Sequence, residues 1–285
     1  MRPYEQIAVH TAPFGDSCLS VLQNIPGPPD TLYSRGVPPS SERPRIAIVG
    51  ARAMTPYGQR IARQLATMVA ARGGVVVSGL AFGIDVTVHR AALARDGRTI
   101  AVLPAGCDDA SITPRTNINT AKEIIQKGMI LSEYPPGTAY RRDLYLRRNR
   151  LISGLAQVVV VIEAGLPSGS LTTAQHALEQ GKDIWAVPGH IDETCAKGAN
   201  ALISDGAQPL IELQVFVDQY CGREVESAAS QSHPIVKLLV DHPRTFEELL
   251  TALRSESEDI LRELSRLEVA GSIIRGNDQR YSLSA

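Results

Sequence analysis

Short apolar runs alternate with longer amphipathic stretches between residues 45 and 213. The runs are rich in Val and Ile, and each is followed by a segment whose apolar residues recur every three or four positions, as on one face of a helix. Such runs without polar alternation are typical of strands buried on both faces of a parallel sheet. The pattern therefore predicts the α/β class with a doubly wound, Rossmann-like parallel sheet. The expected strands are RIAIV at 45–49, VVVS at 75–78, TIAVL at 99–103, MILSE at 129–133, VVVVIE at 158–163 and IWAVP at 184–188.

Both ends of the chain depart from this alternation. Residues 1–44 contain the Pro/Gly-rich stretch NIPGPPDTLYSRGVPPSSERP and show little apolar periodicity, which favours an arm packed on the next domain. The apolar pattern is lost again after Gln219, which favours a linker. We therefore expect an arm at 1–44, a Rossmann-like domain at 45–218, a linker at 219–232 and a small domain at 233–285.

The small C-terminal domain carries helical patterns followed by short strand patterns. Helices are expected at 235–240, 246–254 and 257–269, the last ended by Gly271, and strands at 272–276 and 280–284. Three helices with a two-stranded wing indicate a winged-helix-like module. The last helix is expected to bury Ile260, Leu261, Leu264 and Leu267.

Three predicted strand-to-helix loops are rich in glycine or serine. In the first, Thr55 and Pro56 are typical of a helix start, and in the second Asp85 is expected to cap the helix. Free N–H groups at helix N-termini attract anions, and such loops meet at the carboxyl edge of a parallel sheet. The glycines of the second loop would let its backbone approach a ligand closely. We therefore expect a phosphate-binding edge that includes Gly50, Arg52, Ser78, Gly79, Gly83, Ser168, Gly169 and Ser170.

The segment RRDLYLRRNR at 141–150 holds five arginines and one aspartate. Guanidinium groups pair with phosphates, and Tyr134, Tyr140 and Tyr145 can stack on bases. Asn149 would either bond a base edge or orient an arginine. The segment adds Arg142, Tyr145, Arg147, Arg148, Asn149 and Arg150 to the expected DNA-binding residues.

The charges are segregated along the chain, although the net charge is only −1. Residues 43–152 hold 17 Lys and Arg against 7 Asp and Glu, which leaves 12 basic and 23 acidic residues elsewhere. This asymmetry predicts a basic face with a polyanionic partner.

Composition and motifs narrow the class of function. A hydrophobic content of 44% and a charged content of 21% are typical of globular proteins, and no apolar run approaches membrane-spanning length. The N-terminal residues lack the apolar core of a signal peptide, so a cytoplasmic protein without a membrane partner is expected. GxGxxG, GxxxxGK[ST], GxSxG and HExxH motifs are absent. His89 and His176 lack ligand partners at metal spacing. We therefore expect no catalytic residue, no cofactor and no metal.

Nine longer segments run in order from Arg45 to Ala207. They are IAIVGAR, YGQRIARQLA, VVSGLAFGIDVTVHRAAL, GRTIAVLPAGCD, LSEYPPG, RRNRLISGLA, VVVVIEA, SGSLTTAQHALEQGKDIWAVPG and KGANALISDGA. Together they resemble the DprA/Smf family of bacterial DNA-processing proteins, and the stretch NIPGPPDTLYSRG before them also resembles the family.

The resemblance implies a homodimeric Rossmann-like domain that binds single-stranded DNA in a basic pocket, without catalysis. It also implies a role in natural transformation, in which such proteins protect incoming strands and load the RecA recombinase. An extra N-terminal helical domain found in many members is not expected here.

Residue by residue, the pocket arginine of the family's G-x-R loop falls on Arg52, and a basic residue after a Tyr-Pro pair falls on Arg115. The pair reads Thr113-Pro114 in this chain, so the tyrosine is missing. The family's Phe-Pro-x-Arg-Asn-Arg motif appears at 145–150 with Tyr145 as its aromatic residue, and a basic residue upstream falls near Arg142.

Two other functions are consistent with the class of fold. Phosphoribohydrolases that cleave nucleoside monophosphates carry PGGxGTxxE, whereas residues 167–175 read PSGSLTTAQ, with Gln175 in place of the carboxylate. A neutral amide cannot stabilise the oxocarbenium character of that reaction, and Glu163 is the nearest replacement. The second alternative is an interaction scaffold without DNA affinity. Because the last predicted helix is net acidic, we expect the C-terminal domain to contact protein rather than duplex DNA.

Overall fold

The computed structural model describes residues 6–15, 17–222, 234–253, 257–269, 273–276 and 279–283. The chain divides into two compact units, Met1–Arg223 and Glu224–Ala285. The expected linker at 219–232 lies outside the described residues from residue 223 onward, as does Gly271. No helix among the described residues is both long and apolar enough to span a bilayer.

The larger unit is built on a nine-stranded sheet in the order β1-β2-β6-β5-β4-β3-β7-β8-β9. All pairings from β6 to β9 are parallel, and the two pairings that involve β2 are antiparallel. The six predicted strands are confirmed. The strands are β1 (Ala8–Thr11), β2 (Thr31–Gly36), β3 (Arg45–Val49), β4 (Val75–Ser78), β5 (Arg98–Leu103), β6 (Met129–Ser132), β7 (Val158–Val161), β8 (Asp183–Ala186) and β9 (Gln208–Pro209).

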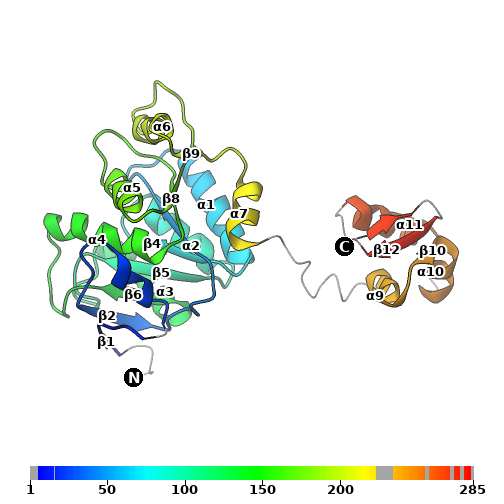
Figure 1. The fold of residues 1–285 in the computed structure, drawn as a ribbon, viewed down its shortest axis with the longest axis horizontal. Helices are drawn as coiled ribbons and strands as arrows, with labels where there is room; N and C mark the ends of the chain where they lie inside the picture. Colours follow the sequence, from blue (N-terminus) through cyan, green and yellow to red (C-terminus); the bar gives the residue numbers. More distant parts are fainter. Residues whose placement is uncertain are drawn as a thin grey trace. The chain divides into compact units, whose positions relative to one another are not determined.

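Helices cover both faces of this sheet (Figure 1), because alternate strand residues point to opposite sides and are apolar on both. Ala47 and Val77 face α4, α5 and α6, whereas Ile46 and Val76 face α1, α2 and α7. The helices are η2 (Ser20–Asn24), α1 (Pro56–Ala71), α2 (Ile84–Leu93), η3 (Arg115–Asn117), α3 (Ile118–Lys127), α4 (Arg142–Leu155), α5 (Gly169–Glu179), α6 (Lys197–Ser204) and α7 (Leu213–Cys221).

The start of α1 follows its sequence signals. The side chain of Thr55 accepts a hydrogen bond from the N–H of Gly58 at 3.1 Å, and Pro56 is the first helical residue. The helix ends at Ala71, and Gly73 follows with φ +71°. The capping prediction for Thr55 is therefore confirmed.

The N-terminal stretch contributes two strands that the sequence analysis does not predict. β1 pairs with β2, and β2 pairs antiparallel with β6, with Tyr33 opposite Ser132. Only Leu32 and Ser34 of β2 are buried, so its apolar pattern is too short to stand out beside the surrounding prolines. The stretch thereby extends the sheet beyond β6.

The smaller unit has its own apolar core. α9 (Pro234–Asp241), α10 (Phe246–Leu253) and α11 (Ser257–Val269) pack with a three-stranded antiparallel sheet in the order β10-β12-β11. Ile260 and Leu264 are buried as predicted, but Leu261 is 49% exposed, so its assignment to the core is wrong. The strands are β10 (Arg244–Thr245), β11 (Ile273–Arg275) and β12 (Arg280–Leu283).

Candidate nucleic-acid interface

A cavity of about 150 Å³ opens at the carboxyl edge of the sheet. It is formed by the loops that follow β3, β4 and β5 and by the first half of α4, so segments that are distant in sequence meet there. Its walls are mostly aromatic side chains, prolines and two guanidinium groups. The lining residues are Arg52, Gly79, Ala81, Phe82, Pro104, Thr113, Pro114, Tyr140, Tyr145 and Arg148.

Arg52 and Tyr145 form the polar corner of this cavity. The Arg52 guanidinium carbon lies 4.5 Å from the centroid of the Tyr145 ring, a cation–π distance. Arg52 is exposed and Tyr145 is half-buried. The charge of Arg52 is therefore held in place by an aromatic ring while its donors stay accessible to a ligand.

Arg148 also lines the cavity, but it is only 1% exposed. Its guanidinium donates hydrogen bonds to the carbonyls of Gly79, at 3.0 Å, and Val102. Beneath it lies Asp85, whose pKa is raised by burial and lowered in part by the Arg148 charge. Arg148 thus joins α4 to the ends of β4 and β5. The predicted direct phosphate contact is not supported by this burial.

Asn149 and Arg150 also have partners within the protein. Asn149 accepts a hydrogen bond from Nε of Arg148 at 3.2 Å and donates one to the carbonyl of Gly169 at 3.0 Å. Of its two expected roles, the observed contact is the orientation of an arginine. Arg150 is 7% exposed and pairs with Glu133 at 2.6 Å.

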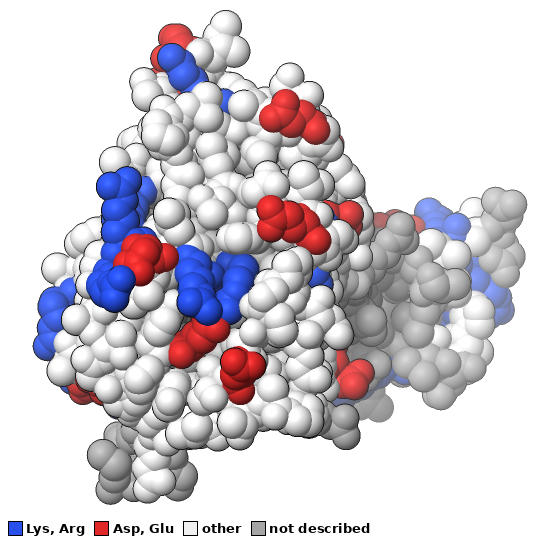
Figure 2. All heavy atoms as spheres, turned by 60° about the vertical axis from the view of Figure 1, so that its left-hand side comes forward, with Lys and Arg blue, Asp and Glu red and all other residues white. Residues whose placement is uncertain are grey.

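The other predicted arginines are exposed beside the cavity rather than in its wall. Arg142 begins α4, Arg147 is 64% exposed in its side chain, and Arg115 donates a hydrogen bond to the carbonyl of Asp109. Figure 2, turned so that the side of α4 in Figure 1 comes forward, shows Lys and Arg side chains gathered on this face with a few acidic side chains between them. This face offers the accessible positive charge that a phosphate backbone needs.

The predicted loop glycines lie close to other atoms of the protein, which leave no space for a Cβ. A Cβ at Gly79 would lie 2.5 Å from Arg148, and one at Gly83, where φ is +75°, would lie 2.2 Å from the carbonyl of Ala51. A Cβ at Gly50 would meet the Ile84 side chain at 2.7 Å, and one at Gly169 would meet Tyr145 at 2.9 Å. The expectation that backbone at Gly79 and Gly83 approaches a ligand stays a prediction. Glycine is needed there because the cavity wall packs against the loops.

The predicted serines differ in how accessible they are to a ligand. Ser78 is fully buried and donates its hydroxyl to the carbonyl of Ile48 at 2.7 Å. Ser168 caps α5 and accepts from the N–H of Ser170 at 3.3 Å, while the two hydroxyls lie 2.7 Å apart. Ser168 is half-buried, so it remains accessible at the edge of the sheet.

Two of the three helix N-termini expected to bind phosphate already carry a carboxylate of the protein. Glu163, only 4% exposed, accepts hydrogen bonds from the N–H of Thr55 at 2.9 Å and from its hydroxyl, and so occupies the start of α1. Asp85 lies in the first turn of α2 and accepts from the N–H of Gly79 at 3.2 Å. The cap position of α2 is Gly83, so the prediction that Asp85 caps this helix is wrong.

One exposed residue of the cavity wall, Phe82, is not among the residues predicted from the sequence. Phe82 is 49% exposed and stands in the loop after β4, between Ala81 and Gly83. An exposed aromatic residue beside glycine in a loop at the ligand edge is the signal that would have found it. Among the described residues, no three His, Cys, Asp or Glu side chains gather as a metal site would require.

Comparisons with known proteins identify a family and a fold that this chain shares. Residues 12–220 match the family model of DNA recombination-mediator protein A. The DNA processing protein DprA of Bacillus subtilis is 36% identical over 228 residues, which are 79% of this chain and 76% of that protein. The chain covers 48% to 61% of several other relatives.

Two solved structures share the fold. DNA processing protein A from Streptococcus pneumoniae aligns with a TM-score of 0.69 at 32% identity, covering 76% of this chain and 75% of that one. The protein of the same name from Helicobacter pylori aligns with a TM-score of 0.66 at 31% identity, covering 77% of this chain and 97% of that one. The latter structure concerns a single-stranded DNA binding mode.

Proposed function

Because the chain belongs to the DprA/Smf family of DNA processing proteins, we propose that it binds single-stranded DNA at the carboxyl-edge cavity, with weak sequence preference. The observation that carries the proposal is the combination of an accessible guanidinium, Arg52, with the aromatic walls of a cavity. The single-stranded DNA binding mode of the H. pylori relative supports the choice of ligand.

The size of the cavity suits a single aromatic ring of a base, and its chemistry suits a phosphate held at Arg52 beside it. A cavity of about 150 Å³ is large enough for an aromatic ring of benzene size. Phe82, Tyr140 and Tyr145 offer faces on which any base stacks, while Arg52 pairs with a phosphate oxygen. Arg115, Arg142 and Arg147 then attract the adjoining backbone. No element of this site resembles a groove reader, which accounts for the weak sequence preference.

Catalysis is not part of the proposal. Gln175, which replaces the carboxylate of the phosphoribohydrolases, is exposed on α5 and donates a hydrogen bond to Glu179 at 3.1 Å. Glu163 is buried at the start of α1 and is engaged by Thr55. Prolonged incubation with nucleoside monophosphates is expected to release no free base, and release that depends on Glu163 would contradict this expectation.

The family also supports a wider role. We infer that the protein acts as a homodimer and passes its bound strand to RecA. The description of the matched family as a recombination mediator supports a role in recombination. We interpret the larger unit as Rossmann-like and the smaller one as winged-helix-like. Light scattering tests the dimer, and assembly of RecA filaments on strands coated with single-strand-binding protein tests the transfer.

Titration of a fluorescent oligonucleotide tests the central proposal. Arg52→Ala should weaken binding by about 1 to 3 kcal/mol, because one charge-assisted phosphate contact is lost. Phe82→Ala should cost about 1 to 3 kcal/mol through lost stacking. Lys197→Gln removes an exposed charge outside the cavity and is the matched control. Unchanged affinity in both cavity variants would overturn the proposed site.

A further inference from the structure

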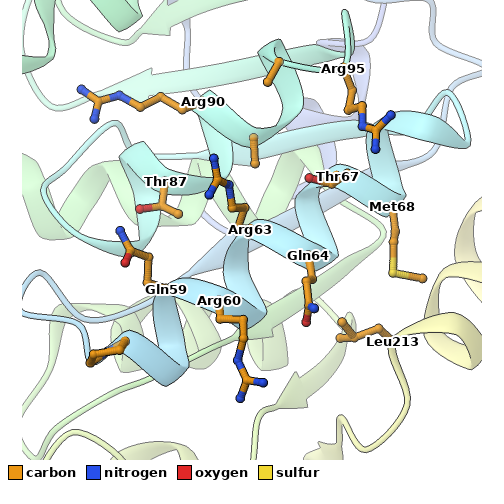
Figure 3. Close-up of a pocket in the computed structure, with 13 residues that line it drawn as sticks. Gln59, Arg60, Arg63, Gln64, Thr67, Met68, Thr87, Arg90, Arg95 and Leu213 are labelled. Carbon is orange, nitrogen blue, oxygen red and sulfur yellow. The ribbon is translucent and has the colours of Figure 1, made fainter.

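A second hollow, much larger than the edge cavity, lies between α1 and α2. This hollow, the α1–α2 groove, has a volume of about 980 Å³. Four arginines line it, Arg60 and Arg63 from α1 and Arg90 and Arg95 from α2 and its end, and no acidic side chain does. Figure 3 shows Arg63 directed from α1 toward α2, with Arg90 in the last turn of α2 and Arg95 just after its end pointing to opposite sides of the view.

The sequence of the two helices places these charges along one track. Gln59, Arg63 and Thr67 recur every four residues on α1, so they form one row about 12 Å long. Ala91 on α2 and Ala94 just after its end are small and leave the groove open between Arg90 and Arg95. The result is an elongated channel with neutral hydrogen-bonding side chains between positive ones.

These charges are not neutralised by the protein. Within the described part of the chain, the guanidiniums of Arg63 and Arg95 form no hydrogen bond or ion pair. Arg90 donates to the hydroxyl of Thr120 at 3.0 Å, and Arg60 lies 5.6 Å from the ring of Tyr57. A face that serves solubility alone mixes both signs of charge, whereas this groove carries only one.

The groove begins close to the edge cavity. The N–H of Ile84 donates to the carbonyl of Ala51 at 3.1 Å, so the loops before α1 and α2 are joined. Pro56 and Thr87 line the near end of the groove, and they follow Arg52 and Phe82 of the cavity by four and five residues. A strand that leaves the cavity over these joined loops would therefore be led toward the near end of the groove.

We propose that the α1–α2 groove binds the phosphate backbone of the same DNA strand as it leaves the edge cavity, which extends the binding site along the helices. This inference rests on the proposed function. Charge favours a polyanion, and an isologous contact with a second copy would bring the arginine rows against each other. Arginine rather than lysine throughout the groove fits bidentate pairing with phosphate oxygens.

Two oligonucleotide lengths test the proposal on the full chain. Wild type, Arg52→Ala, the double variant Arg63→Gln/Arg95→Gln and a control, Lys122→Gln/Lys197→Gln, are titrated with labelled oligo-dT of about 6 and about 40 nucleotides. Lys122 and Lys197 are exposed and lie outside both sites, so the control loses the same charge.

The groove variant should bind the long oligonucleotide about tenfold more weakly than the control and the short one equally well. Its plot of log affinity against log salt for the long oligonucleotide should be shallower by about 1.4, since two phosphate contacts are lost. Arg63→Lys/Arg95→Lys should restore most of the affinity, because the charges return.

Equal binding of the long oligonucleotide by the groove variant and the control would overturn the inference while the edge site stands. Absence of binding of either oligonucleotide to wild type would instead overturn the proposed function. A labelled poly-glutamate peptide is titrated in parallel. Peptide binding that the groove variant loses while it keeps the long oligonucleotide would assign the groove to an acidic protein and contradict the inference.

Discussion

Two guanidiniums flank the ring of Tyr145, but only one of them faces solvent. The Arg52 carbon lies 4.5 Å from the ring centroid and the Arg148 carbon 5.1 Å, yet Arg52 is exposed and Arg148 is buried. A buried guanidinium is retained only when its donors are satisfied and an opposite charge is near, as Asp85 is here. Chemically identical side chains in one cavity therefore differ in accessibility: Arg52 is available to the proposed ligand, whereas Arg148 is held by partners within the protein.

Arg148→Ala should lower the free energy of unfolding by about 3 to 5 kcal/mol, because it leaves Asp85 buried without its cation. Arg52→Ala should change it by no more than about 0.5 kcal/mol, since the side chain is exposed. Urea denaturation followed by circular dichroism measures both. An Arg148→Ala protein of unchanged stability that has lost DNA affinity would show that Arg148 is a DNA ligand after all.

His89 provides a second test at the scale of one side chain. It is fully buried, its Nδ1 lies 2.7 Å from the hydroxyl of Thr99, and burial together with the Arg148 charge lowers its pKa to about 3. The unfolded chain, with a histidine pKa of about 6.5, then binds the proton more readily. The neutral, buried His89 therefore makes its full contribution to the free energy of unfolding above pH 6.5. This contribution is lost as the pH falls toward 3.

Between pH 7.5 and 5.0 this contribution should fall by about 2 kcal/mol. Asp85, whose pKa is raised by burial, acts in the opposite direction at lower pH, so the comparison must be made against a variant that lacks only the imidazole. His89→Gln should show a smaller loss of urea midpoint over this range than wild type does. Parallel pH profiles would contradict the assignment of this loss to His89.

At the scale of the element, the start of α1 shows how the protein uses a helix N-terminus for itself. Glu163 follows β7, yet its carboxylate bonds Thr55 at the first turn of a 16-residue helix. A Cβ at Gly58 would lie 2.3 Å from that carboxylate, so glycine at this position leaves room for the Glu163 side chain. An internal anion therefore takes the place that a helix N-terminus otherwise offers to phosphate.

Glu163→Gln should lower the free energy of unfolding by about 1 to 2 kcal/mol, since the charge at the positive end of α1 is lost. Its affinity for single-stranded DNA should stay within about twofold of wild type, because Glu163 does not line the edge cavity. Glu193→Gln, an exposed carboxylate after β8, is the control for stability. A large loss of DNA affinity in a folded Glu163→Gln protein would place this carboxylate in the binding site.

At the scale of the whole molecule, the two units have separate cores and opposite charge. The larger unit contains residues 43–152, where Lys and Arg exceed Asp and Glu by 17 to 7. Residues 233–285, in contrast, hold 7 Lys and Arg against 9 Asp and Glu. On α11, Arg262 pairs with Asp259 at 3.6 Å and Arg266 with Glu263 at 3.4 Å, so the few basic side chains there are already paired. This acidic helix is poorly suited to a phosphate backbone.

A chain that ends at Gln231 should therefore fold and bind single-stranded DNA nearly as well as the full chain. Its circular dichroism spectrum and thermal transition report folding, and oligonucleotide titration reports affinity. A folded truncated protein whose affinity falls more than about tenfold would mean that the smaller unit contributes to DNA binding.

The sequence by itself determined the local elements and the separation of charge. Strand positions such as 45–49 and the cap at Thr55 follow from spacing and side-chain chemistry within a few residues, so they are visible in the pattern. The excess of basic residues at 43–152 is likewise a property of composition.

Only the tertiary structure decided which of those basic residues are free to bind. Arg148 is buried because a carbonyl 69 residues away accepts a hydrogen bond from its guanidinium and because Gly79 leaves room for it. Glu163 reaches the start of α1 across 108 residues, and Phe82 becomes a cavity wall only when three loops meet. Burial of a long polar side chain depends on partners that packing brings together, and spacing along the chain does not encode those partners.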